Sequence, residues 1–365
     1  MTRLGAAVAV ALLLAACGGG GRQEAKAPVL PPANPEAASK MARAVATAKD
    51  AGGRKRAIEL LRQALKLDPN LWEARYNLGV LLAEEGEVND AEKELAAAFE
   101  LAPNAEDVVV ALAEVRRRRG DAKGSAAALE PFVKQHPKAV SARIALVSAL
   151  RESGNVDAAI EHAREVLVRR PSDPNALAEL AMSHLTRGET DTADLLVKEA
   201  LKADPNNAIA ERTAGLVALK RGDDAVAFQH FAKASSLDPK DTTARLNTGT
   251  VLLQAGVYDK AVEEFRGVLA VKPGDTPAEL GLAAALRGLG ARDKPGPYQE
   301  AERVLKAVLA REPKNLNALF NLAVLYAHFL AKPGEAKPLF ERFLGVAPAS
   351  HPARAEAQKM VAAQK

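Results

Sequence analysis

The sequence predicts an all-α protein, a solenoid of about nine helix–turn–helix repeats, most of them of one fixed length. Three observations support this prediction. Glycine stands at every thirty-fourth position from Gly52 to Gly290, and proline recurs at the same interval from Pro69 to Pro273. Between them, apolar residues such as Leu78 and Leu82 follow the i, i+4 spacing of an amphipathic helix. Self-similarity at one fixed period is typical of a repeat array, in which each unit packs against its neighbours.

The segment 1–16 has the features of a secretion signal. Arg3 gives a positive start, an apolar run follows from Leu4 to Leu14, and the small residues Ala15 and Ala16 come next. The run is too short to span a bilayer, which takes about 20 residues. We therefore predict that residues 1–16 are a cleaved signal peptide and leave them out of the fold.

Cys17, the only cysteine of the 365 residues, directly follows this segment. The stretch "LAAC" at 14–17 resembles the lipobox of bacterial lipoproteins. The resemblance implies that Cys17 is diacylated with fatty acids such as palmitate, and that its new amino terminus is acylated after cleavage. By the family's sorting rule, Gly18 implies anchoring in the outer membrane, on its periplasmic side. The alternative is an ordinary signal peptide with an incidental cysteine.

Residues 17–37 contain the stretches "GGGG" and "PVLPPANP" and predict a flexible linker behind the lipidated cysteine. A linker of this length reaches on the order of 25 Å. The chain carries 50 basic and 46 acidic residues, a formal net charge of +4. A charge this close to neutral indicates no nucleic-acid partner.

The glycine and proline columns divide residues 38–350 into nine units. Six extra residues lie between Gly290 and Ala301 and one lies before Ala336, and we predict that both insertions form loops between helices. Residues 351–365 predict a C-terminal capping helix. The units are 38–71, 72–105, 106–139, 140–173, 174–207, 208–241, 242–275, 276–315 and 316–350.

Within a unit, glycine suits the turn that ends the first helix, because it adopts positive φ at low cost. Asparagine or aspartate near the start of the second helix predicts an N-cap. The small residues Gly79, Gly215 and Gly249 are expected to let the first helix approach alanines of the second helix. The predicted caps are Asn89, Asp157, Asp191 and Asp259, and the predicted alanine partners are Ala91, Ala227 and Ala261.

These units resemble the tetratricopeptide repeat (TPR). "ARYNLGVLLAEEG" at 74–86 and "ARLNTGTVLLQAG" at 244–256 are similar to its first helix, and "DKAVEEFRGVLAVKP" at 259–273 is similar to its second. The first unit departs most, with Ala44 and Val45 where leucine and glycine are usual. The resemblance implies a right-handed superhelix whose first helices line a concave groove.

Signatures of catalysis are missing from the sequence. The six histidines form no paired metal-ligand spacing, and neither a phosphate-binding loop nor a serine elbow occurs. We therefore predict no enzyme activity, no cofactor and no metal site. The run Arg116–Arg119 is interpreted as cations at a helix C-terminus; the alternative is a docking patch for an anionic lipid or an acidic partner.

By family position, the second, fifth and ninth residues of each unit point into the groove. They are mostly apolar and lack the lysine and asparagine that clamp acidic chaperone tails in the family, so we predict an apolar or amphipathic partner segment. The predicted groove residues are Tyr76, Val80, Val110, Ile144, Met182, Arg212, Leu216, Leu246, Thr250, Phe320 and Val324.

The sequence thus predicts a lipid-anchored protein–protein interaction scaffold of the bacterial envelope. It resembles TPR lipoproteins that assist secretins, pili, barrel-assembly machines or cell-wall enzymes, or that serve adventurous gliding motility in myxobacteria. The alternative function is a non-catalytic adaptor that recruits or activates a cell-wall hydrolase or protease.

Overall fold

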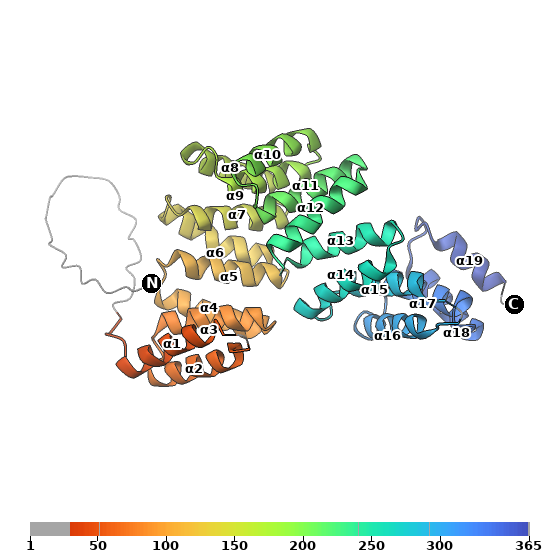
Figure 1. Cartoon of the computed structure of the whole chain (residues 1–365), viewed down its shortest axis with the longest axis horizontal. Coiled ribbons are helices and arrows are strands. Elements are labelled where there is room, and N and C mark those ends of the chain that lie inside the picture. Colours follow the sequence, from red (N-terminus) through yellow and green to blue (C-terminus); the bar gives the residue numbers. More distant parts are fainter. Residues whose placement is uncertain (1–29, 51, 240, 292, 364–365) are drawn as a thin grey trace.

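A computed structural model describes residues 30–363 of the chain, except residues 51, 240 and 292. Cys17 and the predicted signal peptide lie outside the described residues. Within this part the chain forms nineteen α-helices and no β-strand, which confirms the predicted all-α solenoid (Figure 1). The helices are α1 (Pro35–Thr47), α2 (Arg54–Leu67), α3 (Trp72–Glu84), α4 (Val88–Leu101), α5 (Glu106–Arg118), α6 (Ala122–Gln135), α7 (Val140–Glu152), α8 (Val156–Arg169), α9 (Pro174–Thr186), α10 (Thr190–Ala203), α11 (Ala208–Arg221), α12 (Asp224–Leu237), α13 (Thr242–Gln254), α14 (Tyr258–Val271), α15 (Thr276–Leu289), α16 (Gly296–Arg311), α17 (Leu316–His328), α18 (Pro333–Val346) and α19 (Arg354–Ala362).

The helices form consecutive pairs, from α1–α2 to α17–α18, and α19 packs against α18 at the end of the array. Each first helix also packs against the second helix of the preceding unit, as α3 does against α2. First helices of neighbouring units contact one another directly, from α3 to α11 and again from α13 to α17. The second helices of neighbouring units make at most marginal contact within the described residues. The layer of first helices is therefore the more closely spaced one, and the array curves with this layer on the inside.

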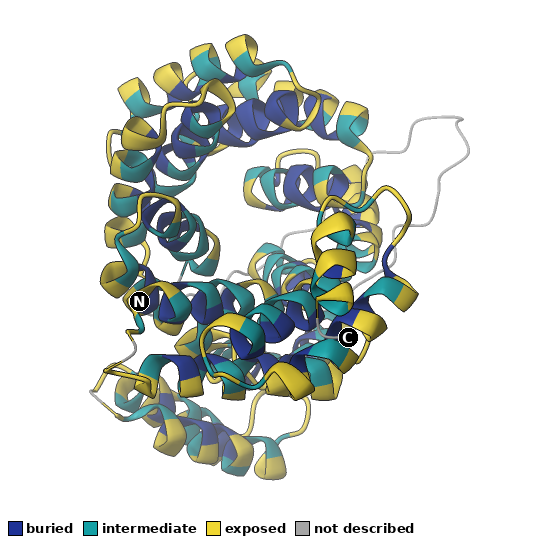
Figure 2. Ribbon diagram, turned by 90° about the vertical axis from the view of Figure 1, so that its right-hand side faces the viewer, coloured by how far each residue is buried: buried dark blue, intermediate teal, exposed yellow. Residues whose placement is uncertain are grey.

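The curvature changes between α11 and α13. Their direct contact is at most marginal, and α13 joins the preceding units mainly through α12. Figure 1 shows that α13–α19 leave the stack of α1–α12 to one side at this point. Viewed from the side, the helices that face the middle of the curve are mainly buried or half-buried, whereas the outer layer shows many exposed residues (Figure 2).

The array begins earlier than predicted. The linker was expected to extend to residue 37, but α1 starts at Pro35. Asn34 caps this helix, because its carboxamide oxygen accepts hydrogen bonds from the amides of Glu36 and Ala37. Proline at the first helical position has the right φ and needs no hydrogen-bond acceptor there. The C-terminal helix is also shorter than predicted, since α19 covers only Arg354–Ala362.

Seven of the eight predicted turn glycines have the left-handed conformation. Gly86 has φ of +83° and Gly154 has φ of +92°, and the same holds for the glycines at 52, 120, 188, 222 and 256. Gly290 differs, with φ of −70° and ψ of 151°. It opens the insertion of the eighth unit, where the chain leaves α15 in an extended conformation instead of turning directly into the next helix.

The N-cap prediction is wrong for the second helices. Asp157 and Asp191 lie at the second helical position of α8 and α10, and the preceding residues Asn155 and Glu189 make no side-chain cap hydrogen bond. Asn89 in α4 and Asp259 in α14 are placed in the same way. In this position the aspartate carboxylates interact favourably with the positive end of the helix dipole, but they accept no hydrogen bond as an N-cap.

The small residues on the first helices make room for large side chains. A Cβ atom on Gly79 would lie 2.6 Å from Leu95 Cγ, and one on Gly215 would lie 2.5 Å from the Phe231 ring. Gly249 meets the Phe265 ring in the same way. The alanines that we expected as partners are fully buried nearby, but Leu95, Phe231 and Phe265 fill the space.

The insertion of the eighth unit is only partly a loop. The chain is outside helices at Gly290, Ala291 and Asp293–Pro295, and then α16 begins at Gly296 and continues to Arg311. Tyr298 lies in α16 and is only 6% exposed, and its hydroxyl donates a hydrogen bond to the carbonyl of Gly290 at 2.7 Å. The prediction that the insertion forms a loop between helices is therefore wrong from Gly296 onward, where α16 has begun and Tyr298 packs into the core.

Candidate functional site

The predicted groove residues lie on seven first helices: α3, α5, α7, α9, α11, α13 and α17. Ten of the eleven are half-buried, namely Tyr76, Val80, Val110, Ile144, Arg212, Leu216, Leu246, Thr250, Phe320 and Val324. Because these helices form the closely spaced inner layer of the curve, the half-buried side chains lie along that layer, on both sides of the change of direction between α11 and α13. Met182 differs: it is 7% exposed and belongs to a buried cluster with Leu185 and Val197.

The apolar members of this face rest on the core beneath them. Tyr76 and Val80 pack against the core of the first three units, and Leu246 and Val324 pack against that of the last three. Phe320 is held most firmly, with ring centroids 5.8 Å from Phe340 and 5.4 Å from Phe343. These side chains are rigidly supported from below and partly open above, which suits them to contact a partner without reordering.

The polar members of the face are already engaged within the chain. Arg212 Nε lies 3.2 Å from an Asp241 carboxylate oxygen. The Thr250 hydroxyl donates to the carbonyl of Leu246 at 2.8 Å. Burial, followed by the neighbouring Asp107 carboxylate, raises the pKa of Tyr76, so its hydroxyl stays protonated at neutral pH. The face therefore offers apolar surface and hydrogen-bonding groups, with little free charge at the predicted positions.

An ion-pair ladder that sequence reasoning missed crosses three of these first helices. Arg117 on α5 pairs with Glu114 at 2.8 Å and with Glu152 on α7. Arg151 on α7 lies 3.5 Å from Glu152 and 3.4 Å from Glu179 on α9. Glu179 and Arg151 are nearly buried, with side chains 6% and 13% exposed. The only sequence signal is the recurrence of arginine at positions 117 and 151, one repeat apart.

The electrostatics of the ladder favour its charged form. Burial raises the pKa of the Glu114 carboxyl, but the guanidiniums of Arg117 and Arg118 outweigh burial and hold the pKa below its ordinary value. The run Arg116–Arg119 is paired throughout: Arg116 and Arg119 contact Glu92, and Arg118 contacts Glu114 at 2.9 Å. These contacts support the interpretation as helix-end cations engaged within the fold.

Three histidines take part in polar contacts inside the units. His230 Nδ1 lies 2.7 Å from Glu211, and His184 Nδ1 lies 2.5 Å from Glu189. Burial lowers the pKa of His162 despite the nearby Glu165 carboxylate. Within the described ranges no three histidine, cysteine, aspartate or glutamate side chains are grouped so that they could hold a metal ion. In the same residues, no helix is both long enough and apolar enough to cross a bilayer.

Comparison with known proteins finds matches to models of one protein family and to solved structures. Two models of the tetratricopeptide repeat match the chain, one at residues 48–115 and 150–212 and the other at residues 110–174 and 296–352. Together these segments cover more than half of the sequence. No curated protein sequence matches the chain.

Solved structures share the fold at low sequence identity. A chain of the APC/C hetero-tetramer Cut9–Hcn1 matches with a TM-score of 0.60 and 16% identity, over 89% of this chain and 62% of that chain. PilF from Pseudomonas aeruginosa matches with a TM-score of 0.52 and 24% identity, over 62% of this chain and 98% of that chain. This chain therefore spans less than two thirds of the length of the first of these structures. At such identities the likeness concerns the arrangement of helices.

Proposed function

We propose that this chain, which belongs to the tetratricopeptide-repeat family, is a non-catalytic scaffold that holds a protein partner along the inner face of its array. One observation carries the proposal: half-buried apolar side chains, supported by the core, follow the first helices from Tyr76 on α3 to Val324 on α17. An extended or helical segment with an apolar stripe matches such a face.

The chemistry of the face restricts the partner. Its apolar positions supply area for burial, which is the main favourable term in association. The ladder from Glu114 to Glu179 adds fixed charges in the middle of the face, and these select partners by electrostatic complementarity more than they add affinity. The partner segment is therefore amphipathic, with an apolar stripe along its length and polar residues where it passes the ladder.

We further propose that the scaffold is held in the outer membrane through a lipid on Cys17. The support is the lipobox-like stretch at 14–17 and the lone cysteine it contains. Three acyl chains bind stably, whereas one alone binds only marginally. From Cys17 to the first helix at Pro35 the linker reaches on the order of 25 Å, so the array would work close to the membrane. In this position it would assemble an envelope machine for motility, pilus formation or secretion.

Two experiments test these parts separately. Metabolic labelling with palmitate should label the wild-type protein and leave the Cys17→Ser variant unlabelled, because the sulfur nucleophile is gone. Label that persists in the variant would contradict the lipid anchor and leave the groove proposal intact.

For the groove, a photo-crosslinking amino acid at Leu246 should capture a partner in intact cells. The same amino acid at Glu263, an exposed position on α14, should not. Replacing Tyr76 or Leu246 by alanine should weaken binding of the captured partner by about 2 kcal/mol, roughly thirtyfold, since a few central side chains dominate most interfaces. Equal capture at both positions would show that the inner face is not the site.

A further inference from the structure

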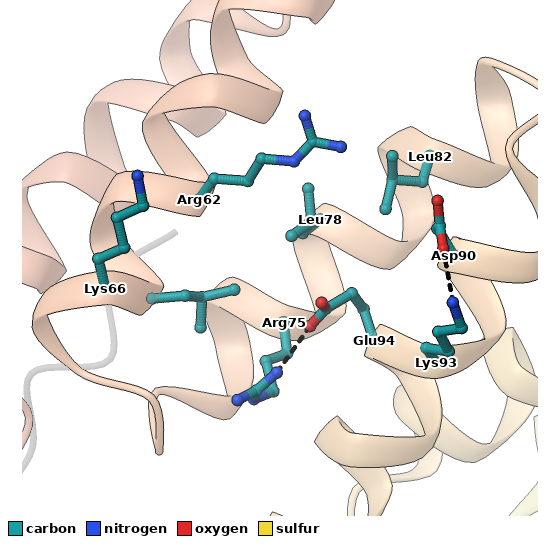
Figure 3. A pocket seen from close by; sticks show the side chains of 9 residues that line it. Arg62, Lys66, Arg75, Leu78, Leu82, Asp90, Lys93 and Glu94 are labelled. Carbon is teal, nitrogen blue, oxygen red and sulfur yellow. Dashed lines mark hydrogen bonds and ion pairs between the residues drawn. The ribbon is translucent and has the colours of Figure 1, made fainter.

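A cavity of about 360 Å³ opens between α2, α3 and α4, away from the inner face. Its floor consists of Leu65, Leu78 and Leu82 (Figure 3). On α3, Leu78 and Leu82 lie on the opposite side of the helix from Tyr76 and Val80, given about 100° of rotation per residue. The cavity is therefore separate from the proposed groove, and both can be occupied at once.

The walls of the cavity carry more positive than negative charge. Arg75 pairs with Glu94 at 2.8 Å and Lys93 pairs with Asp90 at 3.0 Å, so these four groups neutralise one another (Figure 3).

Two further cations stand on α2, one turn apart. Arg62 has only a long contact of 4.0 Å, with Glu87. Lys66 is exposed and has no acidic partner among the residues that the structure describes. The α2 wall thus presents a short row of under-compensated positive charge above an apolar floor.

The next groove of the array shows why this one is open. Between α4 and α6, the rings of Phe99 and Phe132 meet at a tilt of 52°, with their centroids 6.4 Å apart. The residues one repeat earlier are Leu65 and Ala98, which are too small to meet. The cavity thus lies in a groove that has no counterpart of this pair of aromatic rings.

The positive charge at these positions differs from one unit to the next. Three repeats further along, Val168 and Leu195 stand at the positions of Lys66 and Lys93. They are 83% and 66% exposed. The fold thus accepts apolar side chains at both positions, so the helical repeat does not itself require cations there.

We propose that the groove between α2 and α4 is a second binding site, for a protein partner segment in which a large apolar side chain is flanked by carboxylates. The leucine floor accepts the apolar side chain, and a volume of this size is typical of sites that hold one such group. The carboxylates pair with Arg62 and Lys66. These cations stand in a row along one wall, which matches charges spaced along a peptide better than one compact phosphate group.

Fluorescence anisotropy tests the proposal on the full-length chain in detergent. The probe is a short labelled peptide of repeating Leu-Asp-Asp. The comparison peptide has the same length and has lysine in place of each aspartate. Wild-type protein should bind the acidic peptide in preference to the basic one, and more weakly as salt rises. Lys66→Glu should weaken binding about tenfold, since it turns attraction into repulsion at the rim. Leu65→Phe should weaken it by a similar factor, because Leu65 lines the cavity and the larger ring takes up part of its volume.

Lys134→Glu is the matched control, because Lys134 is exposed at the same repeat position on α6. It should leave the affinity within about twofold of wild type, as expected for a charge away from the contact. Equal losses in Lys66→Glu and Lys134→Glu would overturn the proposal and indicate general charge attraction. No binding of the acidic peptide, or unchanged binding by Leu65→Phe, would also overturn it. Binding to phosphatidylglycerol vesicles that depends on Lys66, without binding of the peptide, would overturn the proposal too. The groove would then be a lipid site.

Discussion

The central region of the array, α5–α12, and its C-terminal region, α13–α19, follow the same repeat but are stabilised differently. The C-terminal region has one continuous apolar cluster from Leu252 to Ala357, with Phe265, Phe340 and Phe343 at its centre. In the central region the core is divided among several clusters. It also contains the buried ionisable residues Arg143, Glu179, His184 and Glu211. In the described part of the C-terminal region, Thr248 is the one buried polar residue apart from tyrosines.

The two regions therefore depend on different interactions, apolar packing in one and buried ion pairs in the other. Apolar packing is non-directional and supplies most of the stability. Buried ion pairs add little net stability, because desolvation offsets their attraction, but each fixes one partner against another. We therefore expect the C-terminal region to depend on side-chain volume and the central region to depend on charge complementarity. The following predictions test that contrast in order of expected effect.

The largest effect is expected from Phe340→Ala in the C-terminal region. Phe340 is fully buried, so its removal leaves a cavity and should lower the free energy of unfolding by about 3–5 kcal/mol. Chemical denaturation followed by circular dichroism measures the change. The control is Phe329→Ala, which should cost clearly less, because Phe329 is 39% exposed and its removal takes away less buried apolar surface. Similar midpoints for the two variants would contradict the volume-dependent core.

The insertion of the eighth unit comes next. Tyr298→Ala should lower the free energy of unfolding by about 3 kcal/mol, because the ring is buried and lies 5.2 Å from the Phe329 ring. Tyr298→Phe removes only the hydrogen bond to Gly290 and should cost about 1 kcal/mol. From the sequence alone, deletion of residues 292–298 would be expected to cost little. If Tyr298→Ala and Tyr298→Phe were both as stable as wild type, that expectation would hold.

In the central region, Glu211→Ala should cost about 2 kcal/mol. Glu211 is buried and pairs with His230 and with Lys233, each at 2.7 Å. Its removal leaves His230 without this partner, and Lys233 keeps only its hydrogen bond to the carbonyl of Pro205. Since those partners are about one third or more exposed, water compensates part of the loss.

The double variant Glu211→Leu/His230→Leu should recover most of this stability. One repeat earlier, Leu177 and Leu196 occupy the same two positions. The repeat therefore accepts an apolar pair in place of the charged one, as buried ion pairs often do. Unfolding midpoints of the single and double variants, measured under the same conditions, decide this. A double variant that is less stable than Glu211→Ala would show that the charges are needed for packing and not only for pairing.

The repeat period explains which features could be predicted from sequence. The left-handed turn after a first helix favours glycine, as at Gly86 and its equivalents. The period of glycine alone therefore located the ends of the first helices. The half-buried state of Tyr76 or Leu246 follows from helical position within a unit. The ladder from Arg117 to Glu179 could not be predicted, because its pairs join side chains of neighbouring units whose rotamers the sequence does not define. Tyr298 was missed because an insertion interrupts the period, and a residue outside the period has no predicted face.

The smallest effect concerns the ladder in the central region and its dependence on pH. Glu114→Gln should cost about 0.5–1 kcal/mol at neutral pH, since its carboxylate is more than one third exposed and solvent screens the pair with Arg117. The pKa of Glu114 is held below its ordinary value in the folded protein. A carboxyl of this kind stabilises the fold above its unfolded pKa of about 4.3. The contribution is lost as the pH falls through the lower, folded pKa.

The difference between wild type and Glu114→Gln should therefore be constant from pH 7 down to about pH 5 and shrink below about pH 4.3. Urea midpoints measured across this range give the difference directly. Glu341→Gln, at an exposed position on α18, is the control, because no ion pair involves Glu341 in the described part of the chain. It should show a smaller difference at every pH. A difference for Glu114→Gln that grows on acidification would mean that burial, and not its arginine partners, dominates the pKa of Glu114, and the ladder would then destabilise the central region at neutral pH.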